Sequence, residues 1–262
     1  MKVKKIFQNS LISLSMLLSS TSFAGAIELP PAPSPWYVVL GGGYAWSNST
    51  HTNLDLSFWD PALEGYNSRL GYSPFITLGV GKRVCPILLS EVTSSYFNDF
   101  LYRRYQSSTQ APTPGFTGTS RVRHFDLNNF NVLYNLILNS DHFGLNFFHI
   151  YFTPFIGVGG GLALNTVKNF YTNVATGDVT SIGLNTMRVL SGAGQAEVGL
   201  MAYVSDKLSV DMGYRYYYGG DFRSVSSIFI TTGSGSPAAI AAPAWRGTLT
   251  ANILFAEMRF SA

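Results

Sequence analysis

The chain has 262 residues, of which 46% are apolar, 15% aromatic and only 12% charged. Average globular domains carry about 25% charged residues, so this composition excludes a disordered polyelectrolyte. The single cysteine, Cys85, excludes a disulfide framework and a cysteine-based zinc cluster. The formal net charge of +3 equals the contribution of Lys2, Lys4 and Lys5, and the neutral remainder argues against a nucleic-acid-binding face.

Residues 1–26 have the layout of a secretory signal peptide. Three lysines precede a short apolar stretch at Leu11–Leu18, and an A-x-A cleavage motif ends at Ala26. We expect cleavage after Ala26, with cleavage after Ala24 as the alternative. The apolar stretch is too short to span about 30 Å of hydrocarbon as a membrane anchor. Residues 27–35 are rich in proline and predict an extended periplasmic spacer.

From residue 36 onward, eight segments are rich in aromatic and β-branched residues and contain too much glycine for helices. They are Trp36–Trp46, Tyr72–Arg83, Leu88–Arg104, Ser120–Leu138, Ile150–Val167, Met187–Val204, Leu208–Gly219 and Trp245–Phe260. Apolar residues alternate in them with polar or small ones, as the period of a strand requires. Several exceed the mean strand of about 5–6 residues and reach the roughly 9–11 residues with which a tilted barrel strand crosses a membrane.

One stretch, Phe143–Val167, carries no charged residue and is long enough for a membrane helix. However, it contains Pro154 and several glycines, and its apolar residues also fit a two-residue period. We therefore predict a strand with a bulge at Pro154, because proline cannot donate a hydrogen bond to a ladder.

The connections between these strands alternate between short and long, as in outer-membrane barrels with short periplasmic turns and long surface loops. The short ones are residues 84–87, 139–149 and 205–207, and the long ones are residues 47–71, 105–119, 168–186 and 220–244. Residues 36–262 are therefore predicted to form an all-β domain, a closed eight-stranded antiparallel transmembrane β-barrel with up-and-down topology. Its first and last strands should pair. The alternative is a soluble periplasmic sandwich, which would show the same alternation.

The chain resembles the small eight-stranded outer-membrane barrels of the OmpA, OmpX and opacity-protein type. The resemblance rests on the signal peptide, the glycine-rich and aromatic first strand Val38–Trp46, the strand count and the ending Phe255–Phe260. Such proteins usually end on an aromatic residue read by the barrel-insertion machinery, whereas here Ser261 and Ala262 follow Phe260. The resemblance implies surface, adhesion or structural roles.

Seven charged residues fall on the predicted inward face, and buried charges must be paired. They are Arg83, Glu91, Glu197, Asp211, Arg215, Glu257 and Arg259. Counting back from the turn at 205–207 places Glu197 near Arg215. We expect an ion-pair network that fills the lumen; a gated pore or acid–base catalysis are the alternatives. Aromatic residues at the lipid interfaces should include Trp36, Tyr44, Trp46, Tyr72 and Phe260.

The histidines, His51, His124, His142 and His149, do not converge, so no metal site or cofactor is expected. Because serine is common, a Ser–His–Asp site is easy to imagine, for example from His124, Asp126 and a loop serine such as Ser226, but nothing in the sequence fixes that geometry. Cys85 is expected to be a structural lone thiol in a turn.

The sequence thus predicts an integral outer-membrane protein with a structural or adhesin-like surface role and no catalysis. A narrow pore and a lipid-modifying enzyme are the alternatives. Its expected partners are outer-membrane lipid and lipopolysaccharide, the barrel-insertion machinery, and host or extracellular ligands bound through the four long loops, but not nucleic acid.

Overall fold

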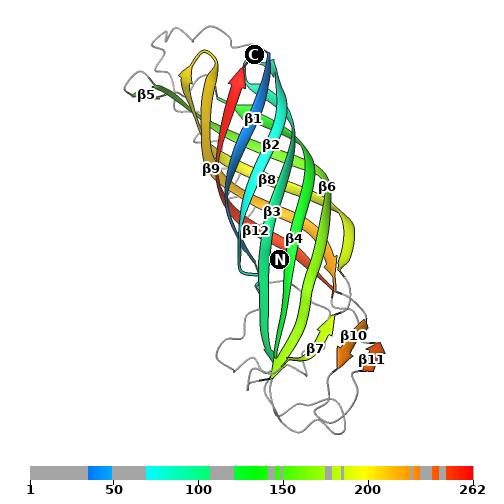
Figure 1. Ribbon diagram of the computed structural model, residues 1–262. Coiled ribbons are helices and arrows are strands. Elements are labelled where there is room, and N and C mark those ends of the chain that lie inside the picture. The colour runs from blue at the N-terminus through cyan, green and yellow to red at the C-terminus, as the bar shows by residue number, and fades with distance from the viewer. Residues whose placement is uncertain are drawn as a thin grey trace, which may run out of the picture. The chain divides into compact units, whose positions relative to one another are not determined.

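The computed structural model describes ten stretches of the chain (Figure 1). They are residues 35–48, 69–106, 121–140, 145–147, 150–174, 179–183, 186–224, 227–230, 238–241 and 246–261. The signal peptide predicted at 1–26, nearly all of the spacer predicted at 27–35, and much of the four long loops lie outside these stretches.

Eight long strands form a closed antiparallel barrel, and four short strands extend it. The long strands are β1 (Trp36–Ser47), β2 (Tyr72–Cys85), β3 (Leu88–Gln106), β4 (Arg121–Asn139), β6 (Ile150–Val174), β8 (Met187–Ser205), β9 (Leu208–Arg223) and β12 (Arg246–Ser261). The short ones are β5 (Leu145–Phe147), β7 (Val179–Gly183), β10 (Ser227–Ile230) and β11 (Ala238–Ala241). Closure comes from β1, which pairs with β12 from Tyr37↔Ser261 to Ser47↔Ala251. The predicted fold class and closing pair are confirmed.

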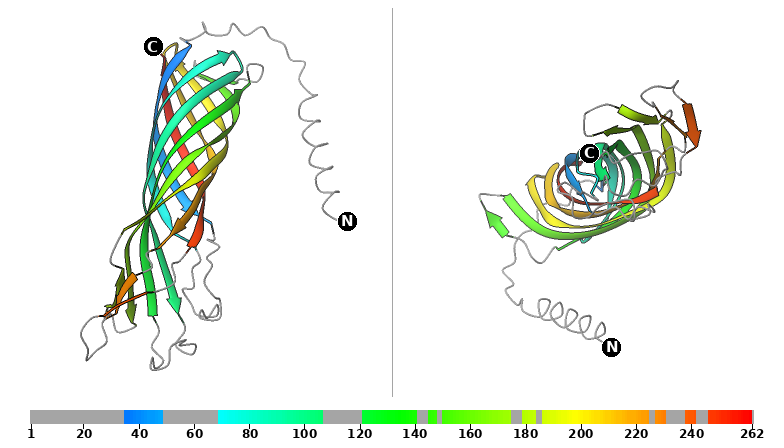
Figure 2. Two further views of the ribbon diagram at one scale, coloured as in Figure 1. Left: turned by 90° about the vertical axis from the view of Figure 1, so that its right-hand side faces the viewer. Right: turned by 90° about the horizontal axis from the view of Figure 1, so that it is seen from below.

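The two ends of the barrel differ in their connections. At one end, which we call the turn end, two-residue turns join β2 to β3 and β8 to β9, and β12 reaches its last residue. At the other, the loop end, the long connections leave the barrel, and β7, β10 and β11 extend it (Figures 1 and 2). Among the described residues, no helix is long and apolar enough to cross a membrane.

The outer face of the barrel is apolar all the way around, because alternate residues of each strand point outward. Large exposed apolar side chains occur on all eight barrel strands, for example Leu40, Leu78, Val92, Leu136, Val158, Val198, Met212 and Leu254. A soluble sandwich would bury these side chains, so the exterior excludes the alternative fold. A closed ring of strands leaves no unpaired edge, which is what a β-structure within hydrocarbon requires.

Several predicted boundaries are wrong, because the ladders continue past the predicted strand ends. β6 extends to Val174, since its last residues pair with the start of β4, and β9 extends to Arg223. The segments predicted as loops at 168–186 and 220–244 therefore contain strand residues, including β7, β10 and β11. The predicted short connection at 139–149 contains β5.

The bulge expected at Pro154 is also wrong. The register of β6 with β8 runs without a shift through Pro154↔Leu200. On its other side, the ladder with β4 ends at Asn139↔Phe155, and Ser140 N donates to Pro154 O at 3.2 Å. The missing donor of the proline thus faces the very end of that ladder, where only one hydrogen bond is lost.

Register shifts occur instead beside the two turns, between Arg83 and Cys85 and between Tyr203 and Ser205, and also toward the loop end. Register shifts interrupt β3–β4 between Phe97 and Phe100, β4–β6 between His124 and Asp126, and β9–β12 between Leu249 and Thr250. Positive φ angles mark these places, 53° at Asp99, 52° at Asn169 and 75° at Gly220. Each bulge changes which side chains point inward beyond it.

Candidate functional site

The lumen is the candidate functional site, and its half next to the turn end holds charged side chains. Arg215 on β9 lies directly opposite Glu197 on β8. Its Nε donates to Glu197 Oε2 at 2.8 Å, and its Nη2 donates to Glu257 Oε1 of β12 at 2.9 Å. The guanidinium also lies over the ring of Phe255, at 4.3 Å from the ring centroid. One cation from the middle strand thus joins two carboxylates from the strands on either side.

A second guanidinium, that of Arg259 on β12, lies nearer the turn end. Its Nε donates to Glu91 Oε1 at 2.6 Å, and its Nη1 pairs with Asp211 Oδ2 on β9. The hydroxyl of Tyr37 on β1 donates to the same Glu91 oxygen at 3.0 Å. Since Glu91 belongs to β3, these contacts link strands across the lumen rather than only along the wall.

Six charges therefore form two triads of buried side chains, one around Arg215 and one around Arg259. Glu91, Glu197, Asp211, Arg215, Glu257 and Arg259 are each at most 7% exposed. Four carboxylates face two guanidinium groups, so the charged layer carries a formal excess of two negative charges if all are ionised. We call this set the charged layer.

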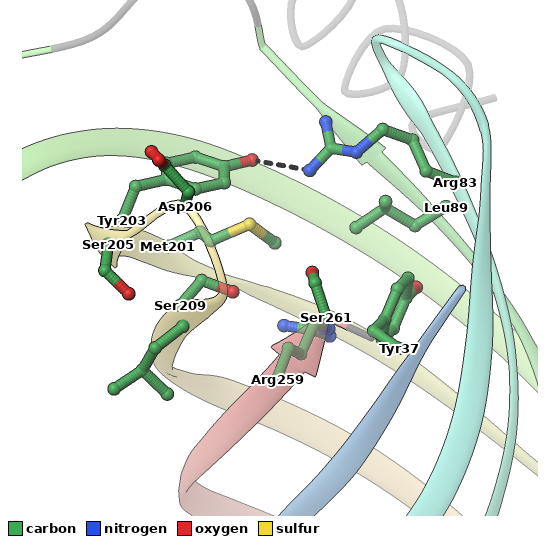
Figure 3. A pocket seen from close by; sticks show the side chains of 11 residues that line it. Tyr37, Arg83, Leu89, Met201, Tyr203, Ser205, Asp206, Ser209, Arg259 and Ser261 are labelled. Carbon is green, nitrogen blue, oxygen red and sulfur yellow. Dashed lines mark hydrogen bonds between the residues drawn. The ribbon is translucent and has the colours of Figure 1, made fainter. Parts of the chain in front are cut away.

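Arg83, the seventh residue of the predicted network, lies apart from the charged layer at the mouth of the turn end (Figure 3). Its Nη2 donates to Tyr203 Oη at 3.2 Å and its Nη1 to Pro86 O at 3.2 Å. Tyr203, Asp206 and Arg259 line the same cavity, which has a volume of only about 20 Å³. That volume holds about one water molecule, so this cavity has no room for a larger solute.

Inward-facing glycines make room for these large side chains. A Cβ on Gly157 would lie 2.6 Å from Glu197 Oε1, and one on Gly41 would overlap Glu257. Both glycines face their carboxylate directly across a ladder, as the pairs Gly157↔Glu197 and Gly41↔Glu257. The glycine-rich strands that the sequence displayed thus serve close approach to lumen side chains.

An amide layer separates the charged layer from the loop end. Asn129 Nδ2 donates to Asn165 Oδ1 at 2.8 Å, and Asn131 Nδ2 donates to Tyr217 Oη at 3.0 Å. The Tyr217 hydroxyl donates to Asn129 Oδ1 at 2.8 Å. Asn165 also donates across the barrel to the carbonyl oxygens of Gly219 and Asp221 on β9, at 2.7 and 2.9 Å.

Aromatic rings fill the lumen next to the loop end. The ring of Phe97 stacks on that of Phe75 at 4.9 Å and on that of Tyr217 at 5.2 Å, and Phe125 stacks on Tyr102 at 4.5 Å. Phe222 of β9 approaches Phe125 at 5.8 Å. We call Phe97, Phe100, Tyr102, Phe125, Phe170 and Phe222 the aromatic plug; each is at most 5% exposed.

Sequence reasoning missed Tyr37, the amide layer and the aromatic plug. The asparagines had a visible signal, because Asn129, Asn131 and Asn135 share the predicted inward face. The plug had none, since the bulge between Phe97 and Phe100 breaks the two-residue period on which the prediction depended. Three exposed or partly exposed arginines at the loop end, described below, were also missed.

The five predicted interface aromatics lie on the outer face. Trp36, Tyr44, Tyr72 and Phe260 are 57%, 51%, 64% and 44% exposed, and Trp46 is half-buried. Trp36 and Phe260 lie at the turn end, whereas Trp46 is paired with Tyr72 farther along the wall. The Tyr44 and Tyr72 rings stack at 5.9 Å.

The residues considered for catalysis or metal binding have other contacts. His124 stacks on Tyr171 at 4.5 Å, and Asp126 accepts a hydrogen bond from Asn169 at 2.6 Å. His51, His142, His149 and Ser226 lie outside the described residues. Within the described stretches, no group of three or more metal-ligating side chains is found. Cys85 is an exposed free thiol beside the β2–β3 turn.

Comparison with known proteins adds solved structures of similar architecture. No protein-family model and no curated sequence matches the chain. Neisserial surface protein A is 15% identical over 87% of this chain and 98% of its own, with a TM-score of 0.47. The outer membrane protein OprG from Pseudomonas aeruginosa is 13% identical over 88% and 98%, with a TM-score of 0.45. Ail, the attachment invasion locus protein of Yersinia pestis, is 10% identical over 85% and 99%, with a TM-score of 0.30.

The strand registers and the apolar exterior, rather than these likenesses, define the class of protein. A closed ring of eight antiparallel strands with exposed apolar side chains all around is a transmembrane β-barrel. Eight strands give an interior just wide enough for side chains to fill, and here three layers of different chemistry fill it.

Proposed function

We propose that this chain is an outer-membrane protein whose barrel is a closed, non-conducting support for binding surfaces at its loop end. The filled lumen is the observation that carries the proposal. The charged layer, the amide layer and the aromatic plug follow one another along the lumen, and the cavity at the turn end has room for about one water molecule.

The interface aromatics support the placement in a membrane. Trp36 and Trp46 lie on the same strand, roughly 33 Å apart along it at about 3.3 Å per residue. At a tilt of about 40° this spans about 25 Å of height, which is the height of the apolar band of outer-membrane barrels. Trp36 and Phe260 would then lie at the periplasmic interface, and Tyr44, Trp46 and Tyr72 at the outer one.

The loop end offers the surface for partners. β6, β7, β10 and β11 continue the sheet beyond the barrel there, on the side where the long connections emerge (Figure 1). Binding functions commonly reside in such segments, held by a rigid scaffold. We propose an adhesin-like or structural role for them, with extracellular ligands bound through the long loops and no catalytic role.

Three measurements test the proposal together. On a gel without boiling, the membrane fraction should contain a form of shifted mobility, and intact cells should expose an epitope tag placed in 231–237 but not one placed at the β8–β9 turn. Bacteria carrying the protein should adhere to cultured epithelial cells, and a variant with 225–245 replaced by a short glycine–serine turn should not. Release by osmotic shock, or an epitope exposed only at the turn end, would contradict it.

A narrow cation-selective pore is the second candidate, because the charged layer has twice as many carboxylates as guanidinium groups. Planar bilayers decide between the two. Purified protein should give no conductance steps, whereas discrete cation-selective steps abolished by Glu257→Gln would favour the pore.

A further inference from the structure

Beyond the plugged lumen, the barrel wall has an irregular seam between β8 and β9 at the loop end. The last ladder pair of these strands is Gly194↔Tyr218. Between this pair and the loop end, the described residues of β8 pair only with β6, from Ala193↔Gly161 to Met187↔Val167, and those of β9 pair only with β12. The bulge at Gly220 bends β9, and Ser191 Oγ bonds the backbone of Asp221 at 3.1 Å in place of a ladder.

A cationic hollow of about 480 Å³ opens at this seam. Arg188 of β8, Arg223 of β9 and Arg246 of β12 line it, together with Asp221 and Thr248. Asp221 is the one carboxylate among the lining residues, and its Oδ1 already accepts a hydrogen bond from Thr248 Oγ1 at 2.9 Å.

The positions of Arg223 and Arg246 favour an anion as the ligand of this hollow. Arg223 and Arg246 lie directly opposite one another in the β9–β12 ladder. Like charges in such a cross-strand pair repel one another. In addition, Arg223 Nε is buried with no hydrogen-bond partner. A phosphate group between the strands would offset the repulsion and accept from guanidinium donors in their fixed fork geometry.

A second hollow, also of about 480 Å³, adjoins the first at Asp221 and runs over small residues. Ser191, Gly192, Ala193, Gly194 and Tyr218 line it. Gly160, paired with Gly194 and exposed, continues this floor on β6. A Cβ on Gly160 or Gly192 would meet no atom within 4 Å, so packing of the chain itself does not require glycine there. The neighbouring Leu162 and Leu190 are exposed, which places the depression in the apolar wall.

We propose that the seam binds a phosphorylated lipid of the outer leaflet. The phosphate lies between Arg188, Arg223 and Arg246, and an acyl chain lies in the glycine-floored depression directly beside it. The three guanidinium groups supply the charge complementarity, and the apolar wall supplies the contact for the chain. The inference rests on the proposed orientation, with the loop end at the cell surface.

Binding of bisphosphorylated, hexa-acylated lipid A to the purified barrel in detergent micelles tests the head-group contact. We expect Arg223→Gln with Arg246→Gln to weaken binding about tenfold or more, since each lost charged hydrogen bond is worth a comparable factor. The matched control, Lys82→Gln with Lys207→Gln, removes the same charge at the turn end and should change affinity less than about twofold. Equal weakening by both pairs would overturn the proposal in favour of diffuse surface charge.

A second pair of variants tests the acyl contact without touching a charge. Gly160→Leu with Gly192→Leu fills the depression from open positions, so the barrel should keep its heat-dependent gel mobility. Lipid A affinity should fall about tenfold, the change expected when apolar contact worth roughly 1.4 kcal/mol is lost. If inorganic phosphate competed for the site as well as lipid A does, the ligand would be a soluble anion, and the proposal of a lipid ligand would be overturned. A change from dimer to monomer with unchanged lipid affinity would identify the face as an interface between copies.

The orientation is tested separately by the epitope exposure described above. Lipid A binding in micelles that depends on the arginines, combined with a loop end that faces the periplasm, would preserve the site and overturn the proposed function. A loop end exposed at the cell surface, combined with lipid A binding that does not depend on the arginines, would overturn the lipid site and leave the proposed function standing.

Discussion

The two halves of the lumen are filled differently. Two guanidinium groups lie among four carboxylates in the half next to the turn end, whereas stacked aromatic rings fill the half next to the loop end. The stability of the charged half depends on specific partners, because each buried charge in it lies against a group of opposite charge. The aromatic half depends on volume and tolerates changes of shape to a greater extent. We therefore expect one substitution in the charged layer to remove much of the barrel's stability in a single step. In the aromatic plug, the loss of stability should instead increase with the side-chain volume that is removed.

The largest effect is expected from Arg215→Ala. The substitution leaves Glu197 and Glu257 buried without their cation, at a cost of about 4 kcal/mol in the free energy of unfolding. Urea titration of the protein in lipid vesicles measures it. Adding Glu197→Gln and Glu257→Gln should restore at least half of the loss, because the uncompensated charges are then gone. An unchanged midpoint for Arg215→Ala would mean that water enters the charged layer.

In the aromatic half, Phe97→Ala should cost about 3 kcal/mol, the lower part of the range for a deleted buried ring, since neighbouring rings can move into the space. Unlike Arg215→Ala, this loss should not be recovered by removing any charge. Phe97→Leu, a smaller change of volume at the same site, should lose less than half as much. Equal losses for the two variants would show that ring stacking, rather than volume, determines the stability of the plug.

The boundary between the halves is tested by Tyr217→Phe, which keeps the ring and removes the hydroxyl. Asn131 Nδ2 and Asn129 Oδ1 then lose a partner, and we expect a cost of about 1–2 kcal/mol. The same change at Tyr216, the preceding residue, which is 45% exposed on the outer face, serves as the control and should cost less than about 0.5 kcal/mol. A smaller effect at Tyr217 than at Tyr216 would contradict a buried amide layer.

The smallest effect is expected for a charge pair outside the lumen. Lys168 Nζ lies 2.9 Å from Asp99 Oδ1, and both side chains are about one-third exposed. Solvent screens such a pair, so Lys168→Met should change the free energy of unfolding by about 0–1 kcal/mol, and less at high salt. If this variant matched Arg215→Ala, burial would not explain the difference between lumen and surface pairs.

Sequence alone determined the features that depend on a strict period. Two-residue alternation assigned the charges to the inward face. Counting back from a predicted three-residue turn at 205–207 placed Glu197 near Arg215, and the structure pairs these two residues through a two-residue turn and a register shift between Tyr203 and Ser205. The same reasoning predicted the closed barrel and its short turns. These inferences need only local geometry, which each residue imposes on the next.

Tertiary structure decided what lies beyond the bulges. Asp99, Asn169 and Gly220 each interrupt a ladder, and after them the alternation that assigns inward and outward faces no longer applies. At or beyond those interruptions lie the aromatic plug, the last residues of β6 and β9, and the hollow that Arg188, Arg223 and Arg246 line. Whether a strand bulges depends on the pairing of its neighbours, and residues far apart in the sequence settle that pairing only when the barrel closes.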